Sequence, residues 1–188
     1  MRNKSTVLNK PPKAFTLWFT GLPCAGKSTL ARLVAEEFQS RGIEVELLDG
    51  DDLRTNICKG LGFSKDDRAE NIRRVGYLCR MLNKHRVCAI AALISPYRSI
   101  RDEVRVSLDD FIGVYVKASS ETCMARDVKG MYKKAIAGEI RNFTGVDDPY
   151  EPPSAPELII DTDCEDPAAS SARIVLKLES LALIPESG

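Results

Sequence analysis

Short runs of apolar, β-forming residues recur along the chain, separated by segments in which apolar residues follow helical spacing. The run VCAIAALI at 87–94 is apolar on both faces, which is typical of a strand buried centrally in a parallel sheet. Another run, FTLWFTG at 15–21, ends in a glycine. We predict strands at 15–21, 45–51, 87–94, 111–116 and 157–161.

Helical spacing is clearest directly after the first predicted strand. Leu30, Val34 and Phe38 share one face of a helix that starts near Gly26, and Gly42 suits the position beyond its end. The alternation of strands and helices predicts a three-layer α/β fold. Further helices are predicted near 67–84, from about 119, and around Ile174, Leu178 and Leu181.

The chain of 188 residues is long enough for one domain with a substantial core. Residues 1–13 are polar and include two prolines, so we expect a flexible N-terminal leader before a domain that spans 14–188. The stretch 127–156 interrupts the alternation, because it is rich in charge, glycine and proline and too long for an ordinary connection. Such a stretch predicts a functional lid.

The charge balance excludes some classes of partner. Lysine plus arginine equals aspartate plus glutamate at 27 each, so no net charge draws the chain to nucleic acid or to a membrane. No apolar stretch reaches transmembrane length, and the N-terminal residues lack the apolar core of a signal peptide. The six cysteines form no CxxC or CxxH pair, so we expect no zinc site, no disulfide framework and a cytoplasmic location.

Residues 21–28 read GLPCAGKS and match the phosphate-loop pattern GxxxxGK[ST]. A tight turn before a helix is the alternative, but here the motif follows a predicted strand and opens an amphipathic helix. Its glycines allow backbone N–H groups to point at phosphate oxygens. Lys27 is then expected to reach the outer phosphates, and the Ser28 hydroxyl to ligate Mg²⁺. The motif predicts a bound nucleoside triphosphate with magnesium.

Acidic residues follow the second predicted strand, where the chain reads LDGDDLR at 48–54. Asp49, Asp51 and Asp52 then lie at the carboxyl end of a strand, where open α/β sheets bind ligands. One carboxylate could ligate Mg²⁺ and another could accept a hydroxyl proton; the alternative is a turn in which Asp52 caps a helix. The lack of an NKxD motif argues against a GTPase.

The chain resembles the adenylylsulfate kinases (APS kinases) from residue 17 to about 162. The matching segments are GLPCAGKST, LDGDDLR, LGFSKDDRAENIRR, ISPYRSIRDEVR, RDVKGMYKKAIAGEI and FTGVDDPYEPP. The phosphate loop is generic, but GFSxxDRxxNIRR followed by ISPYR and KGxYKKA is highly specific. The resemblance implies a P-loop nucleotide-kinase-like fold with a mostly parallel sheet, often as a homodimer. It also implies phosphoryl transfer from ATP to the 3′-hydroxyl of adenosine 5′-phosphosulfate in sulfate assimilation.

The motif and the resemblance together imply a set of site residues. Those expected at ATP are Gly21, Leu22, Pro23, Cys24, Ala25, Gly26, Lys27, Ser28, Thr29 and Arg126. Those expected at the acceptor are Asp49, Arg54, Phe63, Arg68, Asn71, Ile94, Ser95, Lys129 and Phe143. The expected catalytic residues are Asp51, Lys27, Lys129 and Ser95, and the expected magnesium ligands are Ser28 and Asp49.

Aromatic and basic residues suit an acceptor that carries a purine and a phosphosulfate. The resemblance makes Phe63 and Phe143 a sandwich for the acceptor adenine, with core packing as the alternative for Phe63. Arg101 and Arg105 suit either the site or a solvated helix face. Guanidinium forks that match phosphate and sulfate oxygens are offered by Arg54, Arg68, and Arg73 or Arg74.

The predicted lid begins with basic residues that an ordinary helix would leave solvated. Closing them over the phosphates would exclude water and favour transfer over hydrolysis. Ser95 directly precedes Pro96, and the family is sometimes annotated with a phosphoserine there. In-line transfer needs positioning more than a covalent relay, so we expect Ser95 to hydrogen-bond the acceptor. The basic residues are Arg126, Lys129, Lys133 and Lys134.

Two alternatives to an APS kinase stay open. One is another small-molecule or nucleotide kinase on the same fold, and the other is a non-catalytic nucleotide-binding module. Departures from the family pattern are few: Pro23 and Cys24 stand where Ser-Gly is commoner, and Asp52 stands where Asn is usual. Neither removes a needed group, although Cys24 beside phosphates could be oxidisable.

Overall fold

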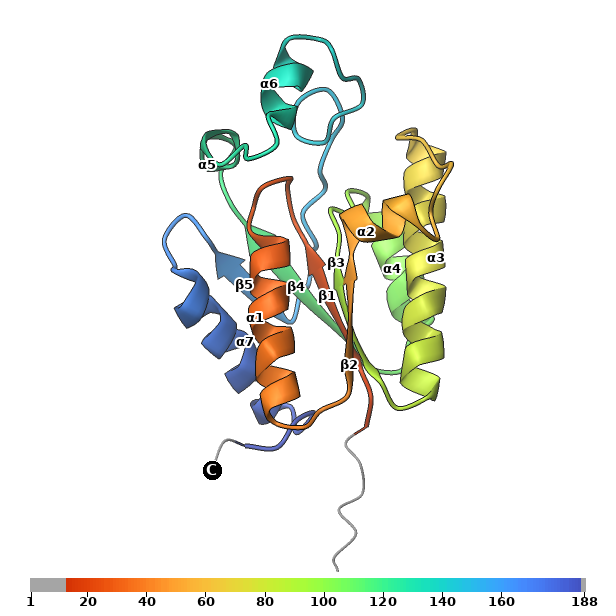
Figure 1. Cartoon of the computed structure of the whole chain (residues 1–188), viewed down its shortest axis with the longest axis vertical. Coiled ribbons are helices and arrows are strands. Elements are labelled where there is room, and N and C mark those ends of the chain that lie inside the picture. Colours follow the sequence, from red (N-terminus) through yellow and green to blue (C-terminus); the bar gives the residue numbers. More distant parts are fainter. Residues whose placement is uncertain (1–12, 187–188) are drawn as a thin grey trace, which may run out of the picture.

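Figure 1 shows a computed structural model of the chain, which describes residues 13–186 as an α/β fold in three layers. Within these residues one sheet has the strand order β2-β3-β1-β4-β5, and all neighbouring strands are parallel. The predicted fold class is confirmed. The leader predicted for residues 1–13 lies outside the described residues, except for Lys13. The strands are β1 (Thr16–Thr20), β2 (Val45–Asp49), β3 (Cys88–Ala92), β4 (Phe111–Lys117) and β5 (Leu158–Asp161).

Helices cover both faces of the sheet, with α1 and α7 on one face and α3 and α4 on the other (Figure 1). Helix α4 has no counterpart among the predicted elements, because only Ile100 and Val104 mark its apolar face. Helix α6 lies inside the predicted lid, which is therefore not wholly loop. The helices are α1 (Lys27–Ser40), α2 (Gly50–Thr55), α3 (Lys65–Lys84), α4 (Arg98–Val106), α5 (Ser120–Ala125), α6 (Met131–Ile136) and α7 (Pro167–Ser180).

Local signals explain where several helices begin and end. Gly42 follows α1 with a φ of 68°, a left-handed conformation that glycine adopts without strain, as predicted. The Ser64 hydroxyl caps α3 by accepting the N–H of Asp67 at 3.1 Å. Asp166 caps α7, and Pro167 occupies its first position, where a missing N–H is tolerated.

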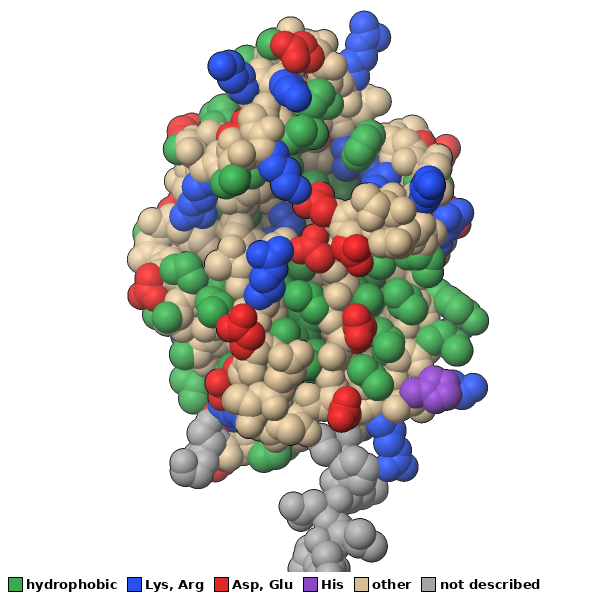
Figure 2. Space-filling model, in the orientation of Figure 1, with side chains coloured by type: hydrophobic (Ala, Val, Ile, Leu, Met, Phe, Trp, Pro, Cys, Tyr) green, Lys and Arg blue, Asp and Glu red, His purple; other side chains and the backbone are tan. Residues whose placement is uncertain are grey.

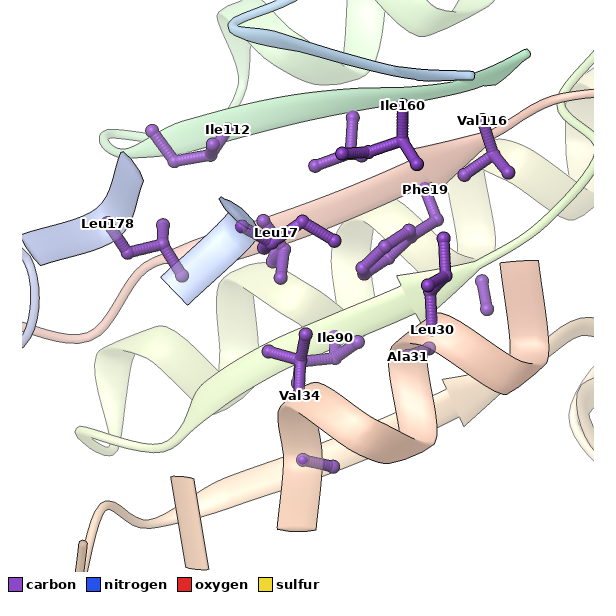
Figure 3. Packing of buried hydrophobic residues seen from close by; sticks show 14 of the residues in the cluster. Leu17, Phe19, Leu30, Ala31, Val34, Ile90, Ile112, Val116, Ile160 and Leu178 are labelled. Atoms are coloured by element: carbon purple, nitrogen blue, oxygen red, sulfur yellow. The ribbon is translucent and has the colours of Figure 1, made fainter. Parts of the chain in front are cut away.

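The larger hydrophobic cluster lies between the sheet and helices α1 and α7 (Figure 3). Leu17 and Phe19 of β1 point into it, as does Ile90 of β3. Val34 of α1 and Leu178 of α7 close it from the helix side. These five side chains are fully buried, so this face of the sheet is a dry interior.

The second hydrophobic cluster lies on the opposite face, against α3 and α4. Trp18 points into it because successive strand residues alternate between faces. Its ring stacks on Phe111 with centroids 5.7 Å apart. Val75 of α3 and Val104 of α4 pack in the same cluster. Both faces of β1 are therefore buried, as expected for a central parallel strand.

The cysteines agree with the expectation that no disulfide framework exists. All six are free thiols, and four of them are buried as small apolar side chains. No helix among residues 13–186 combines the length and apolar character needed to cross a membrane. The buried cysteines are Cys58, Cys79, Cys88 and Cys123.

The carboxyl ends of the parallel strands meet at one edge of the sheet, which is the upper edge in Figure 1. The connection after β1 crosses β3 to reach β2, whereas the connection after β3 crosses β1 to reach β4. Chains therefore leave β1 and β3 in opposite directions, which opens a crevice of the kind in which α/β sheets bind ligands. The segment with α5 and α6 rises above this edge (Figure 1).

Close packing of α3 on α4 predicts a stability effect at Gly76. A Cβ atom there would lie 2.8 and 2.9 Å from the two γ-carbons of Val104. We expect Gly76→Ala to lower the free energy of unfolding by about 1 kcal/mol, because overpacking outweighs the gain in helix propensity. In a Val104→Ala background the same change should raise this free energy. Urea unfolding of the four proteins measures both effects, and equal effects in the two backgrounds would contradict the contact.

Candidate active site

The phosphate loop runs from β1 into α1, and two glycines allow its shape. A Cβ atom at Gly21 would lie 2.3 Å from the carbonyl oxygen of Val116 on the neighbouring strand β4. Gly26 has a φ of 101° and forms the N-cap of α1. The loop therefore wraps around the start of α1, with the backbone N–H groups of a helix N-terminus at its centre.

Lys27 lies inside this loop, and its side chain is buried. Its ammonium group donates to the carbonyl oxygens of Gly21 at 3.0 Å and Leu22 at 2.6 Å. Burial lowers the pKa of Lys27 to about 8, while the nearby carboxylates of Asp49 and Asp51 act in the opposite direction. The protein therefore concentrates a desolvated positive charge at the loop.

A cavity of about 400 Å³ opens beside the phosphate loop. Arg126, one of the residues expected at ATP, lines it and donates to the carbonyl oxygen of Thr162 at 2.6 Å. The Thr162 hydroxyl in turn donates to the carbonyl oxygen of Ala25 at 3.0 Å. Thr162 therefore ties Arg126 to the loop. The other residues lining the cavity are Cys24, Gly26, Lys27, Ser28, Thr29, Leu30, Val128, Glu165 and Pro167.

The acidic residues after β2 do not continue the strand. Strand β2 ends at Asp49, where the sequence predicts strand to 51, because Gly50 already begins α2. The helix cap is Asp49, whose carboxylate accepts the N–H of Asp51 at 3.0 Å, so the predicted alternative with Asp52 as the cap is wrong. Asp52 is exposed and accepts instead from Asn56.

One oxygen of Asp49 is available for a cation. Its Oδ2 atom is buried and has no hydrogen-bond partner among the described residues. No three His, Cys, Asp or Glu side chains gather into a metal cage within residues 13–186. Mg²⁺ bound with a nucleotide needs no such cage, because it takes one or two protein oxygens, substrate phosphates and waters. An unpaired carboxylate oxygen beside a phosphate loop therefore fits the predicted magnesium site.

Asp51 lies in the first turn of α2 and forms an ion pair with Lys129 of the predicted lid. Both side chains are exposed, and the carboxylate of Asp51 raises the pKa of Lys129. Figure 2 shows acidic and basic side chains gathered next to α2, below the segment that carries α5 and α6. The lid therefore meets the sheet edge at the carboxylate predicted as the proton acceptor.

The lid also rests on the phosphate loop through α6. The Tyr132 hydroxyl, almost fully buried, donates to the carbonyl oxygen of Pro23 at 3.3 Å. Its ring packs edge-on against Phe143, with centroids 4.9 Å apart. Phe143 is half-buried, and its N–H donates to the carboxylate of Asp147 at 2.6 Å. One end of the lid thus lies at the loop, and its aromatic residue is fixed by both side-chain and backbone contacts.

The second predicted aromatic residue is exposed. Phe63 is 54% accessible, which excludes the core-packing alternative. The guanidinium carbons of Arg54 and Arg68 lie 4.7 and 5.5 Å from its ring centroid. Arg68 is buried and also donates to the carbonyl oxygens of Phe63 and Asn142. Because Asn142 directly precedes Phe143, Arg68 joins the two aromatic loops.

Asn71 lies one turn along α3 from Arg68 and is also buried. Its Oδ1 atom has no hydrogen-bond partner among the described residues. An unpaired buried carbonyl oxygen is rare in stable interiors, where it costs about 1–3 kcal/mol. This side chain is therefore a candidate for contact with a bound molecule.

Ser95 occupies a strained position directly after Ile94, beyond the end of β3. Its φ of 41° is uncommon for a residue other than glycine. The side chain is 2% exposed: its hydroxyl donates to Thr20 at 3.0 Å and accepts from the Trp18 indole at 3.2 Å. To donate a hydrogen bond to the phosphoryl acceptor, the Ser95 hydroxyl would have to leave Thr20, although its second lone pair could still accept one.

Most of the remaining arginines considered as anion forks have protein partners. Arg73 of α3 pairs with Glu103 of α4, and Arg74 pairs with Glu70 one turn away in α3 itself. Arg105 forms a bidentate pair with Glu157. Arg101 is buried and donates to backbone carbonyl oxygens. Arg54 also donates to backbone carbonyl oxygens, those of Leu61 and Gly62, but it lies with Arg68 against the Phe63 ring, so these two remain the fork positions at the candidate site.

Sequence reasoning missed several residues of this neighbourhood. Tyr97 donates to Asp148 at 2.8 Å, and both lie near Arg68. Tyr97 stands in the segment ISPYR and Asp148 in FTGVDDPYEPP. Their presence in these two family-specific segments was the only sign in the sequence that they belong to the site. Thr162 follows β5 directly, and its position at a strand end was the corresponding signal.

Comparisons with known proteins point to one family. The family model for adenylylsulphate kinase matches residues 13–161. The adenylyl-sulfate kinase of Gloeothece citriformis is 50% identical over 92% of this chain and 98% of its own length. The probable bifunctional SAT/APS kinase 2 of Sorangium cellulosum is 51% identical over 93% of this chain, which spans 30% of that protein. The solved APS kinase of Mycobacterium tuberculosis, in complex with AMPPNP and APS, has a TM-score of 0.86 and 38% identity, covering 90% of this chain and 99% of that one.

The buried charge of Lys27 predicts that this residue, although needed at the site, lowers the free energy of unfolding. Its pKa is about 8 in the folded protein against an ordinary value of 10.5, so below pH 8 the charged group destabilises the fold. We expect Lys27→Met to raise the free energy of unfolding at pH 7 by at most about 3 kcal/mol. This advantage should shrink as the pH rises from 8 to 10.5, where wild-type Lys27 loses its proton in the folded state first.

Urea unfolding of Lys27→Met and wild type at pH 7, 9 and 10.5 measures this effect. The exposed Lys133→Met is the matched control and should change the free energy of unfolding by less than about 0.5 kcal/mol. A Lys27→Met protein that is less stable than wild type at pH 7 would show that the charge is not penalised.

Proposed function

The chain belongs to the adenylylsulphate kinase family, and we propose that its site transfers the γ-phosphoryl group of ATP to adenosine 5′-phosphosulfate (APS). The acceptor atom is the 3′-hydroxyl oxygen of APS, and the products are ADP and 3′-phosphoadenosine 5′-phosphosulfate (PAPS). The observation that carries the assignment is the meeting of three groups at one sheet edge. These are the buried ammonium of Lys27, the unpaired carboxylate oxygen of Asp49, and the Asp51–Lys129 ion pair.

ATP binds with its phosphates in the loop 21–29 and its adenine towards Arg126. Backbone N–H groups of the loop and the N-terminus of α1 hold the phosphate oxygens, and Lys27 faces the outer phosphates. The cavity beside Arg126 supports this placement of the base. Ser28 and Asp49 would hold Mg²⁺, which supplies positive charge against the charge that develops on the phosphates.

The transfer step needs orientation more than covalent chemistry. The 3′-oxygen of APS forms a bond to the γ-phosphorus while the bond to the β,γ-bridging oxygen breaks, so that ADP leaves. Asp51 orients the 3′-hydroxyl and takes its proton late. Lys129 turns from Asp51 towards the transferred group and offsets its charge. The ion pair supports these roles, because it places both groups within reach of one another.

The acceptor binds between α3 and the lid. Phe63 and Phe143 hold the APS adenine, and Arg54, Arg68 and Asn71 hold the phosphosulfate. The exposed ring of Phe63 and the unpaired oxygen of Asn71 support this side of the proposal. Further acceptor contacts are proposed for Asp49, Ile94 and Lys129.

Ser95 has a different role in this proposal from direct contact with the acceptor. Its hydroxyl is buried between Thr20 and Trp18, and its carbonyl oxygen accepts from Arg101. It therefore shapes the end of β3 next to the acceptor site. A covalent phosphoserine is not part of the mechanism.

Release of ADP in the presence of different acceptors tests the function. With ATP and Mg²⁺, we expect APS to support turnover and AMP, adenosine and gluconate to support little. Lys27→Met provides the control for a contaminating kinase. Turnover with gluconate or AMP but not APS would indicate another kinase on this fold, and nucleotide binding without turnover would indicate a non-catalytic module. A cytoplasmic location and a homodimer stay predictions.

The two aspartates should separate in their response to magnesium. Asp51→Asn is expected to lower kcat about 100-fold with both KM values nearly unchanged, because it removes the proton acceptor and keeps the shape. Asp49→Asn should instead show a loss that added Mg²⁺ partly restores. Steady-state kinetics over a series of magnesium concentrations checks both. If added Mg²⁺ restores the activity of Asp51→Asn but not of Asp49→Asn, then Asp51 is the magnesium ligand and Asp49 the proton acceptor.

The aromatic residues should affect the acceptor and not the donor. Phe63→Ala is expected to raise the KM for APS about tenfold and leave the KM for ATP unchanged, since base stacking contributes about 1–3 kcal/mol. Phe143→Ala should do the same and also lower stability, because its ring packs on Tyr132. Tyr77→Ala, which removes an equally exposed ring from α3, is the matched control. An equal loss of ATP affinity would contradict the assignment of these two rings to the APS site.

A further inference from the structure

We propose that Tyr97 and Asp148 are positioning residues of the acceptor site. They hold Arg68 and the loop that carries Phe143 in the positions that APS binding requires. This inference rests on the proposed function, because it assigns APS to that site. Tyr97 lies between β3 and α4, and Asp148 lies in the second half of the lid, 51 positions along the chain. Neither residue is among those assigned a contact with APS or ATP.

Asp148 stands at the meeting point of three elements. Its Oδ1 atom accepts the Tyr97 hydroxyl at 2.8 Å, and its Oδ2 atom lies 3.6 Å from the Arg68 Nε atom. Its own N–H donates to the carbonyl oxygen of Phe143 at 3.2 Å. A single residue thus links the β3–α4 connection and helix α3, through its carboxylate, and the aromatic loop of the lid, through its backbone N–H.

The contact with Arg68 leaves part of the guanidinium group open. Arg68 uses Nε for the Phe63 carbonyl oxygen and Nη2 for the Asn142 carbonyl oxygen, and its Nη1 group makes no hydrogen bond within residues 13–186. The Oδ2 oxygen of Asp148 is buried, faces this arginine and has no hydrogen-bond partner among the described residues. It therefore balances and orients the charge while the Nη1 donors remain for an anion.

Tyr97 fixes the carboxylate from the other side. Its side chain is 5% exposed, and burial together with Asp148 raises its pKa to about 12. The hydroxyl therefore stays protonated at neutral pH and acts as the donor to Asp148. The ammonium of Lys65, at the start of α3, lies 5.3 Å from the Tyr97 ring centroid and covers its face.

The same part of the lid is fastened to the β3–α4 connection at a second point. The N–H of Glu151 donates to the Pro96 carbonyl oxygen at 2.9 Å, and the Glu151 carboxylate accepts the N–H of Arg98 at 2.7 Å. Arg101 donates to the carbonyl oxygen of Glu151 and lies over the Tyr150 ring. Residues 148–151 are thus anchored, whereas Lys129, at the other end of the lid, is held by an exposed ion pair.

These contacts divide the lid into a part that is held weakly and a part that is anchored by buried hydrogen bonds. The Lys129 side chain can leave Asp51 without breaking a buried hydrogen bond, because both groups of this ion pair are exposed. The part around Phe143 cannot shift without breaking the Tyr97–Asp148 and Arg68–Asn142 hydrogen bonds. The acceptor site is therefore held ready by the anchored part, and loosening it should weaken APS binding before it affects ATP.

Kinetics of Tyr97→Phe, Asp148→Asn and the double variant test this inference. Each single variant should raise the KM for APS about tenfold, the effect of losing a hydrogen bond or charge beside a charged group. The KM for ATP should stay within about twofold of wild type. The double variant should resemble Asp148→Asn alone, because the two residues act through one carboxylate. Tyr77→Phe, which removes a hydroxyl from the exposed face of α3, is the control and should behave as wild type.

The outcomes separate this inference from the function on which it rests. If wild type forms no PAPS from APS, the proposed function fails. If wild type is active and Tyr97→Phe keeps both KM values, only the positioning role fails. A double variant whose effects multiply to about a hundredfold would show that Tyr97 acts on APS independently of Asp148. Equal increases in both KM values, with a lowered melting temperature, would show general damage and overturn the role.

Discussion

Lys27 carries a positive charge inside the phosphate loop although its side chain is buried, and the rest of the site is arranged around that charge. Burial alone would favour the neutral amine, which is why the pKa of Lys27 is lowered to about 8. The carbonyl oxygens of Gly21 and Leu22 and the carboxylates of Asp49 and Asp51 oppose it. A phosphate chain bound at the loop would be a better partner than any of these. The fold therefore keeps a site that is less stable alone than with its ligand.

The same charge explains why the lid meets the sheet where it does. Asp51 lies near Lys27 and also pairs with Lys129, so one carboxylate is shared between a fixed lysine and a lysine of the lid. Exposed ion pairs contribute little free energy, so this one can open readily. The buried contacts around Asp148 are of another kind, because breaking them leaves polar groups unpaired in the interior. Weak and strong attachments therefore occur in the same lid.

Residues of strong local character were predictable. A few consecutive residues are enough to predict the conformation of the phosphate loop, of the apolar strand β3 and of the glycine after α1. Helix α4 was not predictable, because its buried face consists of little more than Ile100 and Val104. The sequence offers Asp52 as an alternative helix cap because either aspartate can accept an N–H, and only the point where β2 leaves the sheet makes Asp49 the cap.

The sequence by itself determined the alternation of strands and helices, the phosphate loop and the family, since these depend on short-range spacing and on specific motifs. Tertiary structure alone decided which polar groups pair. Arg73 and Arg68 stand in one helix, yet Arg73 meets Glu103 on a neighbouring helix while Arg68 faces the lid. Likewise Tyr97 and Asp148 become partners only when the lid folds back over the β3–α4 connection. Such pairs join residues far apart in the chain, and their geometry follows from how the layers pack, which no local pattern encodes.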